Sequence, residues 1–163
     1  MYESTIDSND GDRIIRMMSP ITVLIADPDR ARQRVYVRLL QPEKGIRVVK
    51  MVSGALELIK ATVEYKPRIL LLDLNMLKGK EMALIIAVRQ KSPRTRIILI
   101  THRTSQSRIL NALSYGAQGY LEEKAITTFL SKAVRCVDAG EAWVPRKMVA
   151  RIISLLARLT ARE

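Results

Sequence analysis

Residues 69–76 read ILLLDLNM, a run of four aliphatic residues that ends in an acid. A short, continuous apolar run without polar alternation is typical of a strand that is buried on both faces, as in parallel sheets. In open parallel sheets, ligands bind beyond the carboxyl ends of the strands. Asp73, which directly follows the apolar run, is therefore the first candidate for a functional residue.

Four further segments repeat this unit of a short apolar run followed by a stretch with helical spacing. The runs are expected at 21–26, 46–51, 97–100 and, with a weaker pattern, around 119–121. The helical stretches between them have roughly 11 to 15 residues, which is long enough for a crossover to a parallel strand. The chain is therefore predicted to be an α/β protein with a doubly wound, five-stranded parallel sheet covered on both faces.

The carboxyl-terminal part is predicted to contain two helices. The first runs from Ala125 to about Ala139, where apolar residues recur at steps of three and four. The second begins near Pro145 and continues to about Leu159. Its apolar stripe either packs on its own domain or pairs with a second subunit or a further domain, and both alternatives stay open.

The first nineteen residues are predicted to be a disordered leader. Up to position 12 they contain no Lys or Arg and no apolar centre, so they do not have the pattern of a signal peptide. Their acids are Glu3, Asp7, Asp10 and Asp12. An alternative is that Met17 or Met18 is the natural start, because the first convincing element begins after Pro20.

Composition limits the class of protein. The chain has 163 residues, of which 48% are hydrophobic, so a single domain with a full core is expected. Cys136 is the only cysteine and cannot close an intrachain disulfide, and no apolar run approaches the ~18 residues that span a bilayer. We therefore expect a soluble, cytoplasmic protein without a membrane partner. The formal net charge of +12 favours an anionic partner, with a solvated basic surface as the plain alternative.

Four predicted strands are followed by polar or aromatic groups at their carboxyl ends, in the order acid, acid, hydroxyl and aromatic. These groups are Asp27, Asp73, Thr101 and Tyr120. With the segment Asp73-Leu74-Asn75-Met76 and the segment 116–121, they resemble the receiver domain of two-component response regulators over residues 20–139. The resemblance implies the flavodoxin-like strand order 2-1-3-4-5.

Two segments near the carboxyl terminus narrow the resemblance. Residues 137–143 read VDAGEAW, which is similar to the segment that follows the receiver in regulators of the LuxR/NarL type. Residues 159–163 read LTARE, which resembles the start of their helix-turn-helix domain. This implies that residues 140–163 are a linker and a carboxyl-terminal helix, ending where a missing DNA-binding domain would begin.

The resemblance implies a signal-input domain and not an enzyme. Asp73 would accept a phosphoryl group from a sensor histidine kinase, and Thr101 and Tyr120 would be the switch residues. Mg²⁺ would be held by Asp27, Asp73 and the backbone carbonyl of Asn75, with Asp29 as a substitute ligand if its loop shifts. The output would be homodimerisation and DNA binding through the missing domain.

Several residues depart from the family pattern. Pro28 stands where a second metal-binding acid is expected, and Glu123 stands at the position of the phosphoryl-binding lysine. Lys124 follows one residue later and would serve only if a bulge turned it inward, whereas Lys78 and Lys80 are alternative cations. His102 replaces the small residue after the switch threonine.

These departures leave three hypotheses open. The first is a receiver that is phosphorylated at Asp73 and thereby controls dimerisation. The second is a degenerate receiver that controls dimerisation without phosphorylation. Pro28 and Glu123 are the residues that suggest it. In the third, a phosphorylation-independent module uses its basic surface to bind nucleic acid or an acidic partner, and salt-dependent affinity is its signature.

Overall fold

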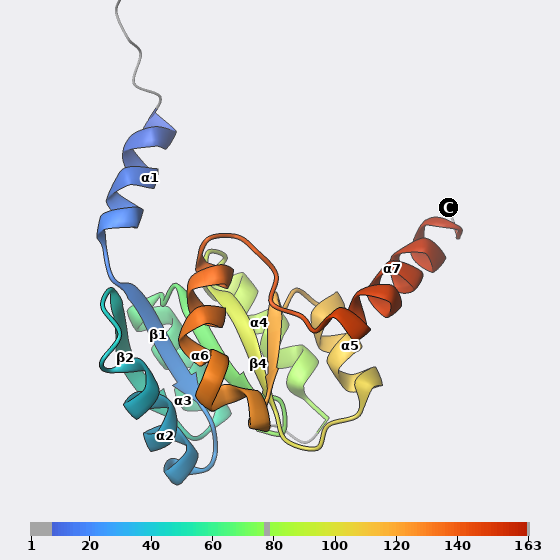
Figure 1. Cartoon of the computed structure of the whole chain (residues 1–163), viewed down its shortest axis with the longest axis horizontal. Coiled ribbons are helices and arrows are strands. Elements are labelled where there is room, and N and C mark those ends of the chain that lie inside the picture. Colours follow the sequence, from blue (N-terminus) through green and yellow to red (C-terminus); the bar gives the residue numbers. More distant parts are fainter. Residues whose placement is uncertain (1–7, 77–78, 163) are drawn as a thin grey trace, which may run out of the picture.

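The computed structural model describes residues 8–76 and 79–162 of the chain (Figure 1). Its single sheet is parallel and has the order β2-β1-β3-β4-β5, so the predicted fold class and strand order are confirmed. The strands are β1 (Ile21–Ala26), β2 (Ile46–Val52), β3 (Ile69–Asp73), β4 (Arg96–Thr101) and β5 (Gly119–Glu122).

Helices cover both faces of the sheet. The covering helices are α2 (Arg30–Leu40), α3 (Ala55–Tyr65), α4 (Glu81–Lys91), α5 (Gln106–Ser114) and α6 (Glu123–Asp138), whereas α1 (Ser8–Met18) and α7 (Arg146–Thr160) extend away from the sheet (Figure 1). Buried residues of α3, α4 and α5 form one hydrophobic cluster with the sheet, and those of α2 and α6 form a second cluster. The molecule therefore has three layers, with β3 in the middle of the sheet.

The central strand β3 explains why its sequence is apolar without alternation. Leu70 and Leu72 belong to the cluster on one face, and Ile69 and Leu71 belong to the cluster on the other. Successive side chains of a strand point to opposite faces, so a strand covered on both faces needs apolar residues at every position. Asp73 ends this strand with its side chain still buried.

The amino-terminal segment differs from the prediction. Residues 8–18 form helix α1 where a disordered leader was expected, while residues 1–7 lie outside the described part of the chain. Asp10 lies in the first turn and Arg16 in the last turn, so both charges complement the helix dipole. A count of acids and bases along the sequence missed this, because the order of the charges and not their number stabilises the helix.

The last helix, α7, packs on its own domain at its start and exposes an apolar stripe over the rest of its length, so both alternatives from the sequence apply in part. Met148 in its first turn is buried in a core cluster, whereas Val149, Ile153, Leu156 and Leu159 are exposed. Figure 1 shows α7 leaving the body of the domain beyond α5. Pro145 is the residue directly before the helix, so the predicted start near Pro145 is confirmed to within one residue. None of the described helices is both long and apolar enough to cross a membrane.

Candidate functional site

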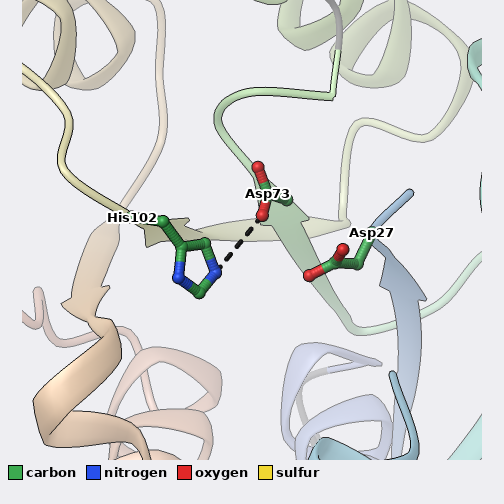
Figure 2. A group of neighbouring side chains, drawn as sticks. All are labelled: Asp27, Asp73 and His102. Atoms are coloured by element: carbon green, nitrogen blue, oxygen red, sulfur yellow. Dashed lines mark ion pairs between the residues drawn. The ribbon is translucent and has the colours of Figure 1, made fainter. Parts of the chain in front are cut away.

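Three titratable side chains meet at the carboxyl ends of neighbouring strands (Figure 2). Asp27 follows β1, Asp73 ends β3, and His102 follows β4. Each offers one ligand atom, and these atoms lie within 4.8 Å of one another. Both carboxylates are buried, and His102 is partly buried. The strand order brings them together, because β1 and β4 both pair with β3.

The backbone around the two aspartates is fixed by local hydrogen bonds. Gln33 donates from Nε2 to the carbonyl of Asp27 (2.6 Å) and to that of Val52 (3.0 Å), which ties the loop after β1 to the end of β2. The N–H of Asn75 donates to Asp73 Oδ1 over 2.7 Å, and its side-chain Nδ2 donates to the carbonyl of His102. The carboxylates are therefore held in place by neighbours from three strand ends.

A guanidinium lies between the two carboxylates. Arg32 contacts Asp27 through Nε and Oδ2 (3.0 Å) and through Nη2 and Oδ1 (3.0 Å). The same Nη2 lies 3.4 Å from Asp73 Oδ2. Hydrogen bonding to Asp27 is the main cause that raises the pKa of Arg32 above its usual value. Arg32 is therefore a cation supplied by the chain itself, placed in the first turn of α2.

His102 adds a second contact to the same oxygen of Asp73. Its Nε2 lies 3.3 Å from Asp73 Oδ2, and the hydroxyl of Tyr36 lies 3.4 Å from that nitrogen and 3.2 Å from Asp27 Oδ2. On its other side, Nδ1 lies 3.1 Å from Glu123 Oε2. Contact with His102 lowers the pKa of the exposed Glu123 carboxyl.

The environment of Asp73 contains opposing effects on its acidity. Burial is the largest of them and raises the pKa of Asp73 above its usual value, and the nearby charge of Asp27 acts in the same direction. The hydrogen bond from Asn75 and the charges of His102 and Arg32 oppose this rise. The net direction is upward, so the ionised form of Asp73 is less favourable in the folded protein than in water.

Residues 23–135 match the family model of the response regulator receiver domain. The chain belongs to this family. The match confirms the prediction of a response-regulator receiver. Receiver domains are in general signal-transduction domains and not enzymes.

The receiver domain is similar in sequence to a named bacterial regulatory protein. It is 26% identical over 133 residues to the oxygen regulatory protein NreC from strains of Staphylococcus aureus, which covers 81% of this chain. The match covers 61% of NreC, so the chain spans less than two thirds of the length of the curated relatives that it matches.

Solved structures of receiver domains share the fold. The isolated receiver domain of RcsB from Salmonella enterica superposes with a TM-score of 0.73 at 24% identity, covering 82% of this chain and 98% of that one. The receiver domain of the putative response regulator NarL from Mycobacterium tuberculosis gives 0.70 at 24% identity, covering 76% and 99%. A LuxR-family regulator from Aurantimonas gives 0.74 at 22% identity, covering 85% and 99%. At these identities the likeness shows the fold alone.

The family implies a Mg²⁺ ion, but the residues around Asp73 do not suit it. Mg²⁺ requires near-octahedral oxygen ligands, and the side chain of Pro28 offers no ligand atom. Asp29 does not join the cluster, because its Oδ1 accepts the N–H of Ala31 (2.8 Å) at the start of α2. Arg32 already contacts both remaining carboxylates, and a divalent cation at its guanidinium would be repelled. The described donor set suits a guanidinium better than Mg²⁺.

Among the described residues, neither the predicted cations nor the switch residues form an ion pair or hydrogen bond with Asp73. Lys124 is 83% exposed and pairs with Glu122, so the sheet has no bulge that turns it inward. Lys78 lies outside the described residues, and Lys80 is exposed. Thr101 and Tyr120 are both buried and line one cleft of about 520 Å³ beside the site. The hydroxyl of Thr101 donates to the carbonyl of Leu121.

The sequence did not single out Arg32 or Tyr36, and it marked His102 only as a replacement for a small residue. One signal was present: Arg32 follows Asp27 by five residues, and the Asp29 cap at the start of α2 turns the first helical turn toward the loop after β1. Such a signal is weak, because α2 contains several arginines and only the three-dimensional packing selects one of them.

Proposed function

We propose that this chain is the signal-input domain of a transcription regulator of the LuxR/NarL type, and that it acts without phosphorylation of Asp73. In this proposal residues 20–139 form an interaction module that controls dimerisation, and residues 140–163 link it to a DNA-binding domain. The observation that carries the proposal is the guanidinium of Arg32, which contacts both Asp27 and Asp73.

The balance of charges around Asp73 supports the proposal that this residue is not phosphorylated. The three carboxylates of Asp27, Asp73 and Glu123 contact one permanent cation, the guanidinium of Arg32, and the imidazole of His102, so the positive charges do not exceed the negative ones even when the imidazole is protonated. Phosphorylation would replace the single negative charge of the Asp73 carboxylate by a phosphoryl group of about −1.5 to −2, which makes the site more negative. With no excess of positive charge among these five groups, phosphorylated Asp73 would be poorly neutralised.

The contacts of Asp73 support the same conclusion. Its Oδ1 accepts the N–H of Asn75, and its Oδ2 contacts both Arg32 and His102. An attacking carboxylate oxygen must lose such contacts or share them with the incoming group. The side chain is moreover almost fully buried, so a phosphodonor could reach it only after neighbouring side chains move.

The proposed output is dimerisation through α7. Its exposed apolar residues recur at steps of three and four, which is the spacing of one helix face. Such a face is stabilised when it pairs with a second copy of the same helix. For comparison, one structure of the relative RcsB from Salmonella typhimurium is described in terms of its interaction with DNA. DNA binding by the present protein would require the further domain.

Intact mass spectrometry tests the phosphorylation part. The chain, Asp73→Ala and a conventional receiver are each incubated with acetyl phosphate, with and without Mg²⁺. We expect the conventional receiver alone to gain the mass of a phosphoryl group. A gain in the wild type that Asp73→Ala lacks would overturn the proposal and restore a sensor histidine kinase and Mg²⁺ as the expected partner and cofactor.

Light scattering tests the dimerisation part. We expect a dimer of the wild type without any phosphodonor, and a monomer of Ile153→Ser/Leu156→Ser on α7. The matched control is Leu56→Ser/Val63→Ser, which removes two exposed apolar residues from α3 and should leave the dimer intact. A monomeric wild type, or equal loss of the dimer in both variants, would rule out α7 as the dimer interface.

A further inference from the structure

A basic cleft lies at the end of the domain opposite to Asp73. It is formed by α1, the turn between α3 and β3, and the turn between α4 and β4, and has a volume of about 960 Å³. All three segments precede strands, so the cleft opens at the amino ends of the sheet, where Figure 1 shows α1. Its cationic lining residues are Arg13, Arg16, Lys66, Arg68, Lys91 and Arg94.

Most of these cations lack an anionic partner. Arg68 pairs with Asp138, with 2.8 Å between Nε and Oδ1, and also donates to the carbonyl of Arg16. Within residues 8–76 and 79–162, the other five cations of the lining form no ion pair, and Asp12 is its only acid. The cleft therefore contains more positive charge than its own acids neutralise.

Helix ends account for part of this charge but not for all of it. Arg16, Lys66 and Lys91 lie at the carboxyl ends of α1, α3 and α4, where the helix dipole favours a cation. Each helix end is equivalent to roughly half a negative charge. When the three helix ends and the acids Asp12 and Asp138 are subtracted from the six cations, an excess of about two to three positive charges remains.

Arg16 experiences this excess directly. Burial is the main cause that lowers the pKa of Arg16, and the charges of Arg68, Arg96 and Arg94 lower it further, against the single opposing charge of Asp138. Cations that repel one another in a cleft are stabilised by a bound anion. The lining thus offers positive potential, space and accessible donors in one place.

We propose that this cleft binds the phosphate backbone of a nucleic acid. Four of its six cations are arginines, whose planar guanidinium presents paired donors that match phosphate oxygens. Ile15 is the one large aliphatic side chain in the lining. The centre of a protein interface is apolar and poor in charge, whereas interfaces with nucleic acid are polar and strongly positive. The composition therefore favours nucleic acid over an acidic protein.

The proposed contact goes beyond the function proposed above. It concerns the described residues alone, without a recognition helix, and it uses phosphates that are the same in every sequence. Binding should therefore be independent of nucleotide sequence and should weaken steeply with salt, because each neutralised phosphate releases counterions. It would add backbone contacts to any base contacts made by a further domain.

Fluorescence anisotropy with a labelled DNA duplex of arbitrary sequence tests the proposal. The variant Arg13→Gln/Arg94→Gln removes two unpaired cations and keeps side chains of similar length. The matched control Arg34→Gln/Arg38→Gln lowers the net charge equally at exposed positions on α2, on the other face of the sheet. We expect the cleft variant to bind about tenfold more weakly at low salt, with the salt slope reduced by about 2.

The control variant should retain most of the affinity of the wild type and most of its salt slope. Equal weakening in both variants would mean that net charge alone attracts DNA, and the proposal would fail. It would also fail if the wild type did not bind at about 25 mM salt, or if polyglutamate of equal charge displaced the duplex as well as unlabelled DNA does. Circular dichroism of each variant excludes loss of the fold as the cause.

Discussion

The two ends of the sheet use the same residue types in opposite ways. At the carboxyl ends, Arg32 contacts the buried carboxylates of Asp27 and Asp73, so its charge is neutralised within the domain. At the amino ends, Arg13 and Arg94 have no ion-pair partner among the described residues, and their charge is available to a ligand. Partners and burial, and not residue type, therefore decide whether a basic residue stabilises the fold or attracts a ligand.

The largest expected effect comes from removing the cation at the carboxyl ends. Arg32→Ala leaves the buried carboxylates of Asp27 and Asp73 without their shared partner. Breaking a buried ion pair costs about 3–5 kcal/mol. Because the Arg32 side chain is 33% exposed and water replaces part of its effect, we expect a loss of about 2 kcal/mol in the free energy of unfolding, measured with urea at neutral pH.

The cleft variant Arg13→Gln/Arg94→Gln is the matched comparison for this loss. It removes cations that repel their neighbours, so its free energy of unfolding should stay within about 0.5 kcal/mol of the wild type or rise. The contrast between the two ends would be broken if Arg32→Ala left stability unchanged, or if the cleft variant were destabilised as strongly.

The second prediction concerns metal binding at the carboxyl ends. In the wild type the positive charge of Arg32 opposes a divalent cation, and a unit charge at ~4 Å is worth roughly 1–4 kcal/mol in a wet or semi-exposed site. We therefore expect Arg32→Ala to bind Mg²⁺ at least about tenfold more tightly than the wild type by isothermal titration calorimetry. Arg32→Lys keeps a cation and should stay weak; equal affinity of all three proteins would contradict the repulsion by Arg32.

The fold was predictable from sequence because its signals are local and repeated. Each strand appears as a short apolar run, and β3 is apolar at every position because both of its faces are covered. The polar residue after each run, such as Asp27 or Asp73, marks the edge of the sheet where functional groups gather. These patterns need no knowledge of which helix packs against which strand.

The ion pairs at the site were not predictable in the same way. Arg32 and Asp27 are near in sequence, but the approach of Arg32 to Asp73 and of His102 to Glu123 depends on three strands and two helices meeting. The sequence indicated that Pro28 and Glu123 are unusual, but it suggested lysines after β3 and β5 as the compensating cations and not Arg32. Helix α1 was missed because its stabilising charges lie in a segment that composition alone describes as acidic.

The third prediction uses the acidity of Asp73. Since burial raises its pKa in the folded state above the unfolded value near 3.8, the folded protein binds the proton more tightly. Stability from this group is therefore fully present below about pH 4 and is lost as the pH rises through the folded pKa. Each unit by which the pKa is raised corresponds to about 1.4 kcal/mol.

Asp73→Asn removes this titration while Oδ1 of the asparagine still accepts the N–H of Asn75. The difference in unfolding free energy between variant and wild type should therefore shift in favour of the variant as the pH rises above 4, and then become constant. Urea unfolding at several pH values measures it. A difference that is flat, or that moves in favour of the wild type, would show that Arg32 and His102 outweigh burial at Asp73.

The smallest expected effect is that of Lys124, which the family pattern had suggested as a substitute for the phosphoryl-binding lysine. Its side chain is 83% exposed and forms a surface pair with Glu122, and exposed pairs contribute roughly 0–1 kcal/mol. Lys124→Ala should therefore change the free energy of unfolding by less than about 0.5 kcal/mol. The same variant should leave the weak Mg²⁺ affinity unchanged. A marked change in Mg²⁺ binding would place Lys124 near Asp73 in solution, and the cations at the carboxyl ends would then no longer be supplied by Arg32 and His102 alone.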